Sequence, residues 1–201
     1  ADWRKHTKPF FFSSRKSVKL THTDSRVLSE RVNRMKRGEY CFFSAVWYNL
    51  GTDYDWLTNP DTNYKYNANV HWTTVEDIVP EAGDIKYVWE KSRFSFLYDI
   101  IRYDQKSGEN HASFVFSQIE DWIHKNPLNC GPNYKCSQEI SLRVLNWLFA
   151  LNFYKNSTFL TEDRWNTIIQ SIYWQINHVY ENINFSRYTV RNNHAITETM
   201  T

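Results

Sequence analysis

The sequence between residues 137 and 151 reads SQEISLRVLNWLFAL, and it is the part of the chain most informative about the architecture. Ser137 is expected to cap a helix that runs to about Tyr154. The helix is apolar on nearly every side, which is typical of a helix buried among others. Glu139, Arg143 and Asn146 follow one another at spacings of four and three and form its only polar stripe. This stripe predicts either a buried ion pair or the wall of a cleft.

Other segments also show helical spacing of apolar residues, with capping residues or Gly and Pro at their ends. The predicted helices cover residues 24–37, 85–103, 109–124, 161–179 and a final segment from about 192. Residues 42–50 are expected to form a short strand or packed extended chain, 182–188 a connection, and 1–20 an irregular arm. The pattern predicts an all-α fold of antiparallel helical hairpins without a convincing sheet.

Composition limits the classes of function. The formal net charge of +2 disfavours a nucleic-acid binder, which usually carries a strong basic excess. Aromatic residues make up 17% of the chain, which is typical of a helical domain with an aromatic-lined groove for sugars, although most of these rings are expected in the core. No apolar run approaches the roughly 20 residues that a membrane span needs, and no signal peptide is visible.

The cysteines are compatible with either a disulfide bond or free thiols. There are three, too few for a disulfide framework. Cys130 and Cys136 flank Gly131-Pro132 and could pair across a loop in an oxidising compartment, or they could remain free thiols.

The last stretch, Arg191-Asn192-Asn193-His194-Ala195-Ile196-Thr197-Glu198, gathers polar side chains of several kinds. If Asn192 or Asn193 caps a helix, His194 and Glu198 share one face, and Glu198 can fix the tautomer of the imidazole. Asn193 would add an uncharged donor, which suits an anionic sugar. Two ligands are too few for a zinc site, so no metal is predicted, and no cofactor is indicated.

Three segments together resemble the heparinase II/III family of polysaccharide lyases. Each pattern alone is weak, but their order and spacing extend over roughly residues 55–201. The segments are the Trp-Glu-x-x-Arg pattern within Gly83–Arg93, the run Asp121–Pro127 with Gly131, Asn133 and Glu139–Trp147, and Asn192-Asn193-His194.

The resemblance implies an incomplete (α/α) toroid and β-elimination on uronate-containing polysaccharides. By match to the family signature, Asn193 would bind the uronate carboxylate, and His194 would act as a base or substrate ligand. An enolate-like transition state needs donors on its developing charge, and histidine has a suitable pKa for proton transfer. Further substrate contacts are expected from Asn192, Glu198, Trp89, Glu90, Arg93, Trp122, Asn133, Glu139 and Arg143.

The chain also departs from the family. The catalytic tyrosine, the second histidine and the C-terminal β-sandwich of the family would lie beyond residue 201. We therefore expect a fragment, inactive by itself and prone to self-association, whose parent acts on acidic polysaccharide in the periplasm or outside the cell. The alternatives are a glycoside hydrolase, with its acids among Glu90, Glu139 and Glu198, or a non-catalytic carbohydrate-binding domain that stacks sugars on Trp56, Trp72, Trp89 and Trp122.

Overall fold

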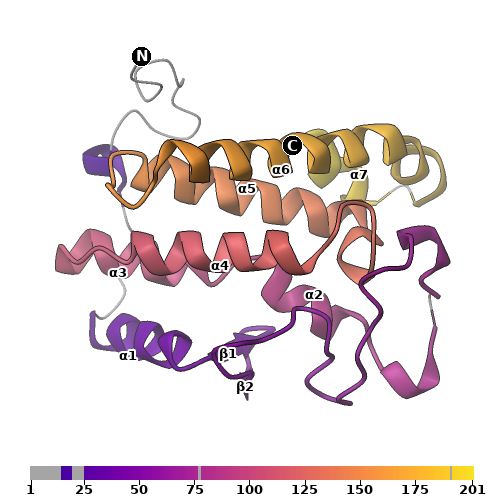
Figure 1. Cartoon of the computed structure of the whole chain (residues 1–201), viewed down its shortest axis with the longest axis horizontal. Coiled ribbons are helices and arrows are strands. Elements are labelled where there is room, and N and C mark those ends of the chain that lie inside the picture. Colours follow the sequence, from indigo (N-terminus) through magenta and orange to yellow (C-terminus); the bar gives the residue numbers. More distant parts are fainter. Residues whose placement is uncertain (1–14, 20–24, 77, 191) are drawn as a thin grey trace.

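The computed structural model describes residues 15–19, 25–76, 78–190 and 192–201. This part of the chain is mostly helical, with one two-stranded antiparallel sheet (Figure 1). No helix within it combines the length and the apolar character that crossing a membrane requires. The α-helices are α1 (Ser25–Lys36), α2 (Lys86–Ser92), α3 (Leu97–Ser107), α4 (Ala112–Lys125), α5 (Ser137–Tyr154), α6 (Glu162–Asn184) and α7 (Asn193–Thr199).

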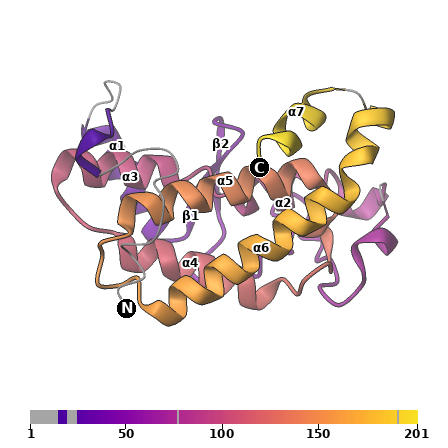
Figure 2. The same cartoon turned by 90° about the horizontal axis from the view of Figure 1, so that it is seen from above.

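Helix α5 lies at the centre of the packing, as its apolar sequence predicts. It contacts α2, α3, α4, α6 and α7. In Figure 1, α5 and α6 run side by side above α3 and α4, while α1 and the sheet lie below. Figure 2 shows that α7 turns back beside α5. The side chains of Ile140, Val144 and Trp147 have no exposed surface, so the core surrounds this helix.

The expected bounds of α5 are confirmed, but its cap is not. Cys136 takes the N-cap position without a capping side chain, and Ser137 is the first helical residue. The expected start of α6 at residue 161 agrees with the structure, where the side chain of Thr161 caps the helix by accepting a hydrogen bond of 3.2 Å from the amide of Arg164.

The segment 85–103 is not one helix, and this prediction is wrong. Helix α2 ends at Ser92 and α3 begins at Leu97, because Phe94 adopts a left-handed backbone with φ of 61°. Its ring is fully buried, stacks on Trp56 at 5.1 Å between centroids, and meets Trp147 edge-on at 5.3 Å. Packing of this one ring therefore sets the bend that apolar periodicity alone did not reveal.

Residues 39–49 form a β-hairpin. Strands β1 (Glu39–Phe42) and β2 (Val46–Asn49) pair antiparallel, with Phe42 opposite Val46. The turn between them has positive φ at Phe43 and Ser44. Two positive φ values are the mark of a type I′ turn, which usually contains Asn-Gly. The sequence prediction located a strand here but not the hairpin.

The expected connection at 182–188 is also wrong. Helix α6 continues to Asn184 and passes into a π-helical segment, η6 (Phe185–Val190). At the other end of the chain, the expected arm lies largely outside the described residues, apart from a short 3₁₀ helix, η2 (Arg15–Ser17).

Candidate functional site

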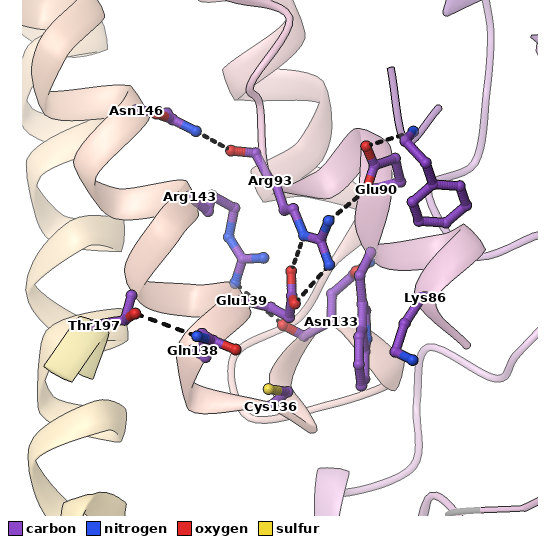
Figure 3. A network of polar contacts seen from close by, with 12 residues as sticks. Lys86, Glu90, Arg93, Asn133, Cys136, Gln138, Glu139, Arg143, Asn146 and Thr197 are labelled. Carbon is purple, nitrogen blue, oxygen red and sulfur yellow. Dashed lines mark hydrogen bonds and ion pairs between the residues drawn. The ribbon is translucent and has the colours of Figure 1, made fainter. Parts of the chain in front are cut away.

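Three separate parts of the chain meet at the N-terminal end of α5. The end of α2 reaches it through ion pairs between Arg93 and Glu139 (Figure 3). Helix α7 reaches it through Gln138, whose side-chain amide donates a hydrogen bond of 3.2 Å to the hydroxyl of Thr197. We call this region the α5 N-terminal site. It gathers residues from all three patterns that the sequence singled out.

Arg93 is held by two carboxylates. Its Nη2 donates to Oε1 of Glu139 at 2.8 Å, its Nε donates to Oε2 of the same carboxylate, and its Nη1 donates to Glu90. The second oxygen of Glu90 accepts a hydrogen bond of 2.9 Å from the amide of Phe43 in the hairpin turn. Burial lowers the pKa of Arg93, but the two carboxylates outweigh this effect and leave the pKa above its ordinary value. The guanidinium is therefore already neutralised by protein groups.

Arg143 is a fully buried cation one turn further along α5. Its Nε donates to Oε1 of Gln175 at 2.7 Å, and its Nη2 donates to the carbonyl of Asn133 at 3.1 Å. The guanidinium lies 4.0 Å from the ring centroid of Trp122, and Nη1 has no hydrogen-bond partner in the described part of the chain. Burial lowers the pKa of Arg143 to about 10. Arg143 thus links α5 to α6 and to the preceding loop.

Several residues expected to touch substrate are enclosed by the protein instead. Trp122 and Arg143 have no exposed surface, and Asn133 is only 1% exposed. Asn133 donates to the carbonyl of Trp56 at 2.9 Å and to Asn126 at 2.8 Å. The predicted direct contacts of Trp122, Asn133 and Arg143 with substrate are therefore wrong for this structure, and these side chains support the site from within the core. Trp56 is fully buried as well and offers no stacking face.

Two of the tryptophans considered for sugar stacking keep part of their surface exposed. Trp89 is half-buried on α2, and its indole Nε1 donates to the carbonyl of Pro132 at 2.8 Å. Trp72 is half-buried and meets the ring of His178 edge-on at 5.2 Å. Of the two, Trp89 lies closer to the α5 N-terminal site, because its indole is bonded to Pro132 in the loop that precedes α5.

Helix α7 forms as the sequence predicted. The side chain of Asn192 caps it by accepting a hydrogen bond of 2.9 Å from the amide of His194. His194 and Glu198 share a face, with 3.8 Å between Nδ1 and Oε1. Glu198 also accepts a hydrogen bond of 2.6 Å from Ser186, and burial raises the pKa of its carboxyl group. The exposed side chain of Asn193 lies next to this pair in sequence.

Sequence reasoning missed Cys136 as a neighbour of His194. The thiol sulfur lies 3.9 Å from Nδ1, the same nitrogen that faces Glu198. Burial raises the pKa of the Cys136 thiol to about 11, so the sulfur is a neutral group at physiological pH. Nδ1 thus faces two protein groups, whereas no hydrogen bond or ion pair joins Nε2 of His194 to any residue in the described part of the chain.

The considered pairing of Cys130 with Cys136 is not formed, because both thiols are free, as is that of Cys41. In the described segments, His, Cys, Asp and Glu side chains nowhere gather in threes that could hold a metal ion.

The residues around the N-terminal end of α5 include the exposed amide of Asn193, the imidazole of His194 and the half-buried indole of Trp89, beside an arginine already paired with two carboxylates. Such a set can bind a polar ligand through hydrogen bonds and ring stacking. Searches of protein-family models, curated proteins and solved structures found no match to the chain.

Proposed function

We propose that the chain is part of the helical domain of a polysaccharide lyase that acts on uronate-containing chains, and that its helices belong to an incomplete (α/α) toroid. The observation that carries the proposal is the meeting of three motifs at one place. The Trp-Glu-x-x-Arg segment, the start of α5 and the Asn-Asn-His segment are distant in sequence. The ion pair of Arg93 with Glu139 and the approach of Cys136 to His194 bring them together in space. These are the segments that resemble the heparinase II/III family.

In this proposal, Asn193 and His194 bind and activate the uronate. The amide of Asn193 donates to the carboxylate of the sugar and stabilises the charge that develops when the neighbouring carbon loses its proton. His194 presents Nε2 either as the base or as a second donor. Trp89 offers a ring face to the sugar, while Glu90 and Glu139 hold Arg93 in place. The tyrosine that would protonate the leaving oxygen is not assigned.

A glycoside hydrolase is the weaker alternative. A hydrolase needs two carboxylates placed across the scissile bond, one of them protonated. Glu90 and Glu139 instead bind the same guanidinium, that of Arg93, so both carboxylates are already engaged by one protein side chain. Glu198 has a raised pKa, as a catalytic acid requires. No sequence motif, however, identifies a second carboxylate among the described residues as its catalytic partner.

The first test measures binding of short uronate oligosaccharides to the 201-residue chain, with tryptophan fluorescence as the readout. We expect binding that Asn193→Ala and His194→Ala each weaken about tenfold, the effect of roughly 1.4 kcal/mol. Ile196→Ala is the matched control, because this exposed residue lies on the same helix. Binding that both site variants leave unchanged would refute the placement of the site.

The second test is chemistry, measured as the ultraviolet absorbance of an unsaturated uronate. We expect residues 1–201 to produce no increase in this absorbance, because no described residue is assigned as the acid that protonates the leaving group. Robust turnover by this chain would contradict the proposal, whereas binding without cleavage by any longer form of the protein would support the non-catalytic alternative. A periplasmic or extracellular location remains part of the proposal, since acidic polysaccharides occur there.

Self-association is a further part of this proposal. Helix α6 and η6 carry exposed aromatic side chains, which a complete toroid would cover. They are Tyr173, Trp174, Tyr180, Phe185 and Tyr188. Sizing by sedimentation is expected to show concentration-dependent oligomers, and a monodisperse monomer would count against it.

A further inference from the structure

A second candidate site lies beneath the hairpin. A cavity of about 200 Å³ opens between α1, β1 and the segment that joins α2 to α3. Its wall includes the buried side chains of Tyr40, Phe42 and Lys91, and the exposed Ser44 and Ser95 also border it. The cavity therefore joins an enclosed wall that includes the Lys91 side chain to a rim with hydroxyl groups.

Lys91 is an unusual member of this wall. The residue is only 4% exposed, and its Nζ lies 3.7 Å from the ring centroid of Trp56, 4.5 Å from Tyr40 and 5.1 Å from Tyr54. Neither a hydrogen bond nor an ion pair joins this Nζ to any residue of the described ranges. Buried lysines are normally paired, so three aromatic rings are an incomplete replacement for water and counterion.

The surroundings shift the amine toward its neutral form. Burial lowers the pKa of Lys91 to about 7, and the charge of Lys125 acts in the same direction, while Asp121 opposes it. Glu90 and the ion pair of Arg31 with Asp99, at 2.7 Å, also border the cavity. About half of the Lys91 amines are then neutral at pH 7, compared with roughly one in three thousand for an ordinary lysine.

We propose that Lys91 is a nucleophilic amine that forms an imine with a short hydroxyaldehyde bound in this cavity. A desolvated lysine in an apolar pocket is a typical nucleophile for carbonyl compounds. The volume suits a molecule of a few heavy atoms, and the hydroxyls of Ser44 and Ser95 match hydroxyl groups on the ligand. This site is independent of the polysaccharide proposal.

The reaction balances without an oxidant or a reductant. The lone pair of Nζ forms a bond to the carbonyl carbon, and the π electrons of the carbonyl move to its oxygen, which takes a proton. Nζ loses its protons in turn, and the hydroxyl of the carbinolamine leaves as water when the C=N bond forms.

The test uses glycolaldehyde at less than one equivalent per chain at pH 7, with cyanoborohydride to reduce the imine to a stable amine. Peptide mapping then compares Lys91 with Lys125, whose Nζ pairs with Asp53 at 2.6 Å and Asp121 at 3.0 Å. The ion pairs outweigh the burial of Lys125 and raise its pKa. We expect at least tenfold more adduct at Lys91, and a ratio near one in the native chain would overturn the proposal.

Three further measurements make the result specific. Unfolding in urea should abolish the selectivity, because both amines then have ordinary pKa values; selectivity that survives would count against a site made by the fold. Lys91→Met should leave the initial rate of labelling at Lys125 unchanged, measured before the aldehyde is depleted; a changed initial rate at Lys125 would contradict independent sites. Ser95→Leu should fill the mouth of the cavity and reduce labelling of Lys91 at least fivefold, and unchanged labelling would refute binding in the cavity.

Discussion

Replacing Arg93 by methionine tests whether the ion-pair network holds the α5 N-terminal site together. The change keeps an aliphatic side chain but leaves Glu90 and Glu139 facing the vacated position without a cation. The side chains of Arg93 and Glu139 are 23% and 7% exposed, so the pair is largely shielded from water. Removing one partner of a buried pair costs about 3–5 kcal/mol. Partial exposure places Arg93→Met near the lower end, at about 3 kcal/mol.

Urea unfolding monitored by circular dichroism measures this decrease in the free energy of unfolding. A decrease of about 3 kcal/mol corresponds to roughly 6–12 °C in Tm for a chain of this length. Glu139→Gln in the Arg93→Met background should cost little more, because the uncompensated charge has been removed. The double-mutant cycle should therefore give a coupling of about 2 kcal/mol between the two positions.

The control is Lys86→Met. Lys86 and Asp84 are 59% and 51% exposed and 3.6 Å apart, and an exposed pair of this kind is worth only about 0–1 kcal/mol. If Arg93→Met costs less than about 1 kcal/mol, or if the coupling is zero, the network does not stabilise the fold and the reasoning is refuted.

Three further predictions concern single positions. Gly38→Ala should destabilise the chain by more than about 2 kcal/mol in urea unfolding, because a Cβ there would lie 2.1 Å from the carbonyl oxygen of Gly51. Gly108 has open space around it, so Gly108→Ala should cost only about 1 kcal/mol. Equal losses for the two variants would contradict this prediction. Glu198 has a raised pKa in the folded state, so the stability it contributes is present below its unfolded pKa and is lost as pH rises through the folded value. Glu198→Gln should consequently be at least as stable as the native chain at pH 7 and lose this advantage at low pH, and a large loss at pH 7 would refute the sign. Cys136 should be alkylated by iodoacetamide about a hundredfold more slowly at pH 8 in the folded chain than in urea, since its thiol pKa is about 11, and equal rates would show that the thiol is not buried.

The part of the fold that could be predicted from sequence is the part governed by local periodicity. Helix α5 is apolar on nearly all sides, and its predicted bounds agree with the structure. The break at Phe94 could not be predicted in this way, because apolar spacing continues through it. The stacking of its ring against Trp56 and Trp147 overrides local preference, and those partners lie tens of residues away in sequence.

The hairpin shows a related limit. A type I′ turn is usually recognised by Asn-Gly, but Phe43 and Ser44 occupy its centre. The amide of Phe43 donates to Glu90 on α2, so a long-range contact supports a turn that its own residues disfavour. A sequence pattern of four or five residues cannot contain this information.

The candidate site, too, could be predicted from the sequence only in part. The cap of α7 and the shared face of His194 and Glu198 follow from spacing along one helix, and both could be predicted. The approach of Cys136 to His194 and the aromatic surroundings of Lys91 arise from contacts between distant segments. Nothing in the local sequence distinguishes Lys91 from a solvent-exposed lysine on α2.

Phe94 places two selection pressures in opposition. Glycine would adopt the left-handed backbone at this position without strain, a relief of about 1 kcal/mol. It would also delete a ring that fills the space between two tryptophans, and losing a buried phenylalanine side chain costs about 3–5 kcal/mol. Laboratory evolution for thermostability should therefore retain the aromatic residue at this bend, and a consensus rule that assigns glycine to left-handed positions would choose the wrong amino acid here.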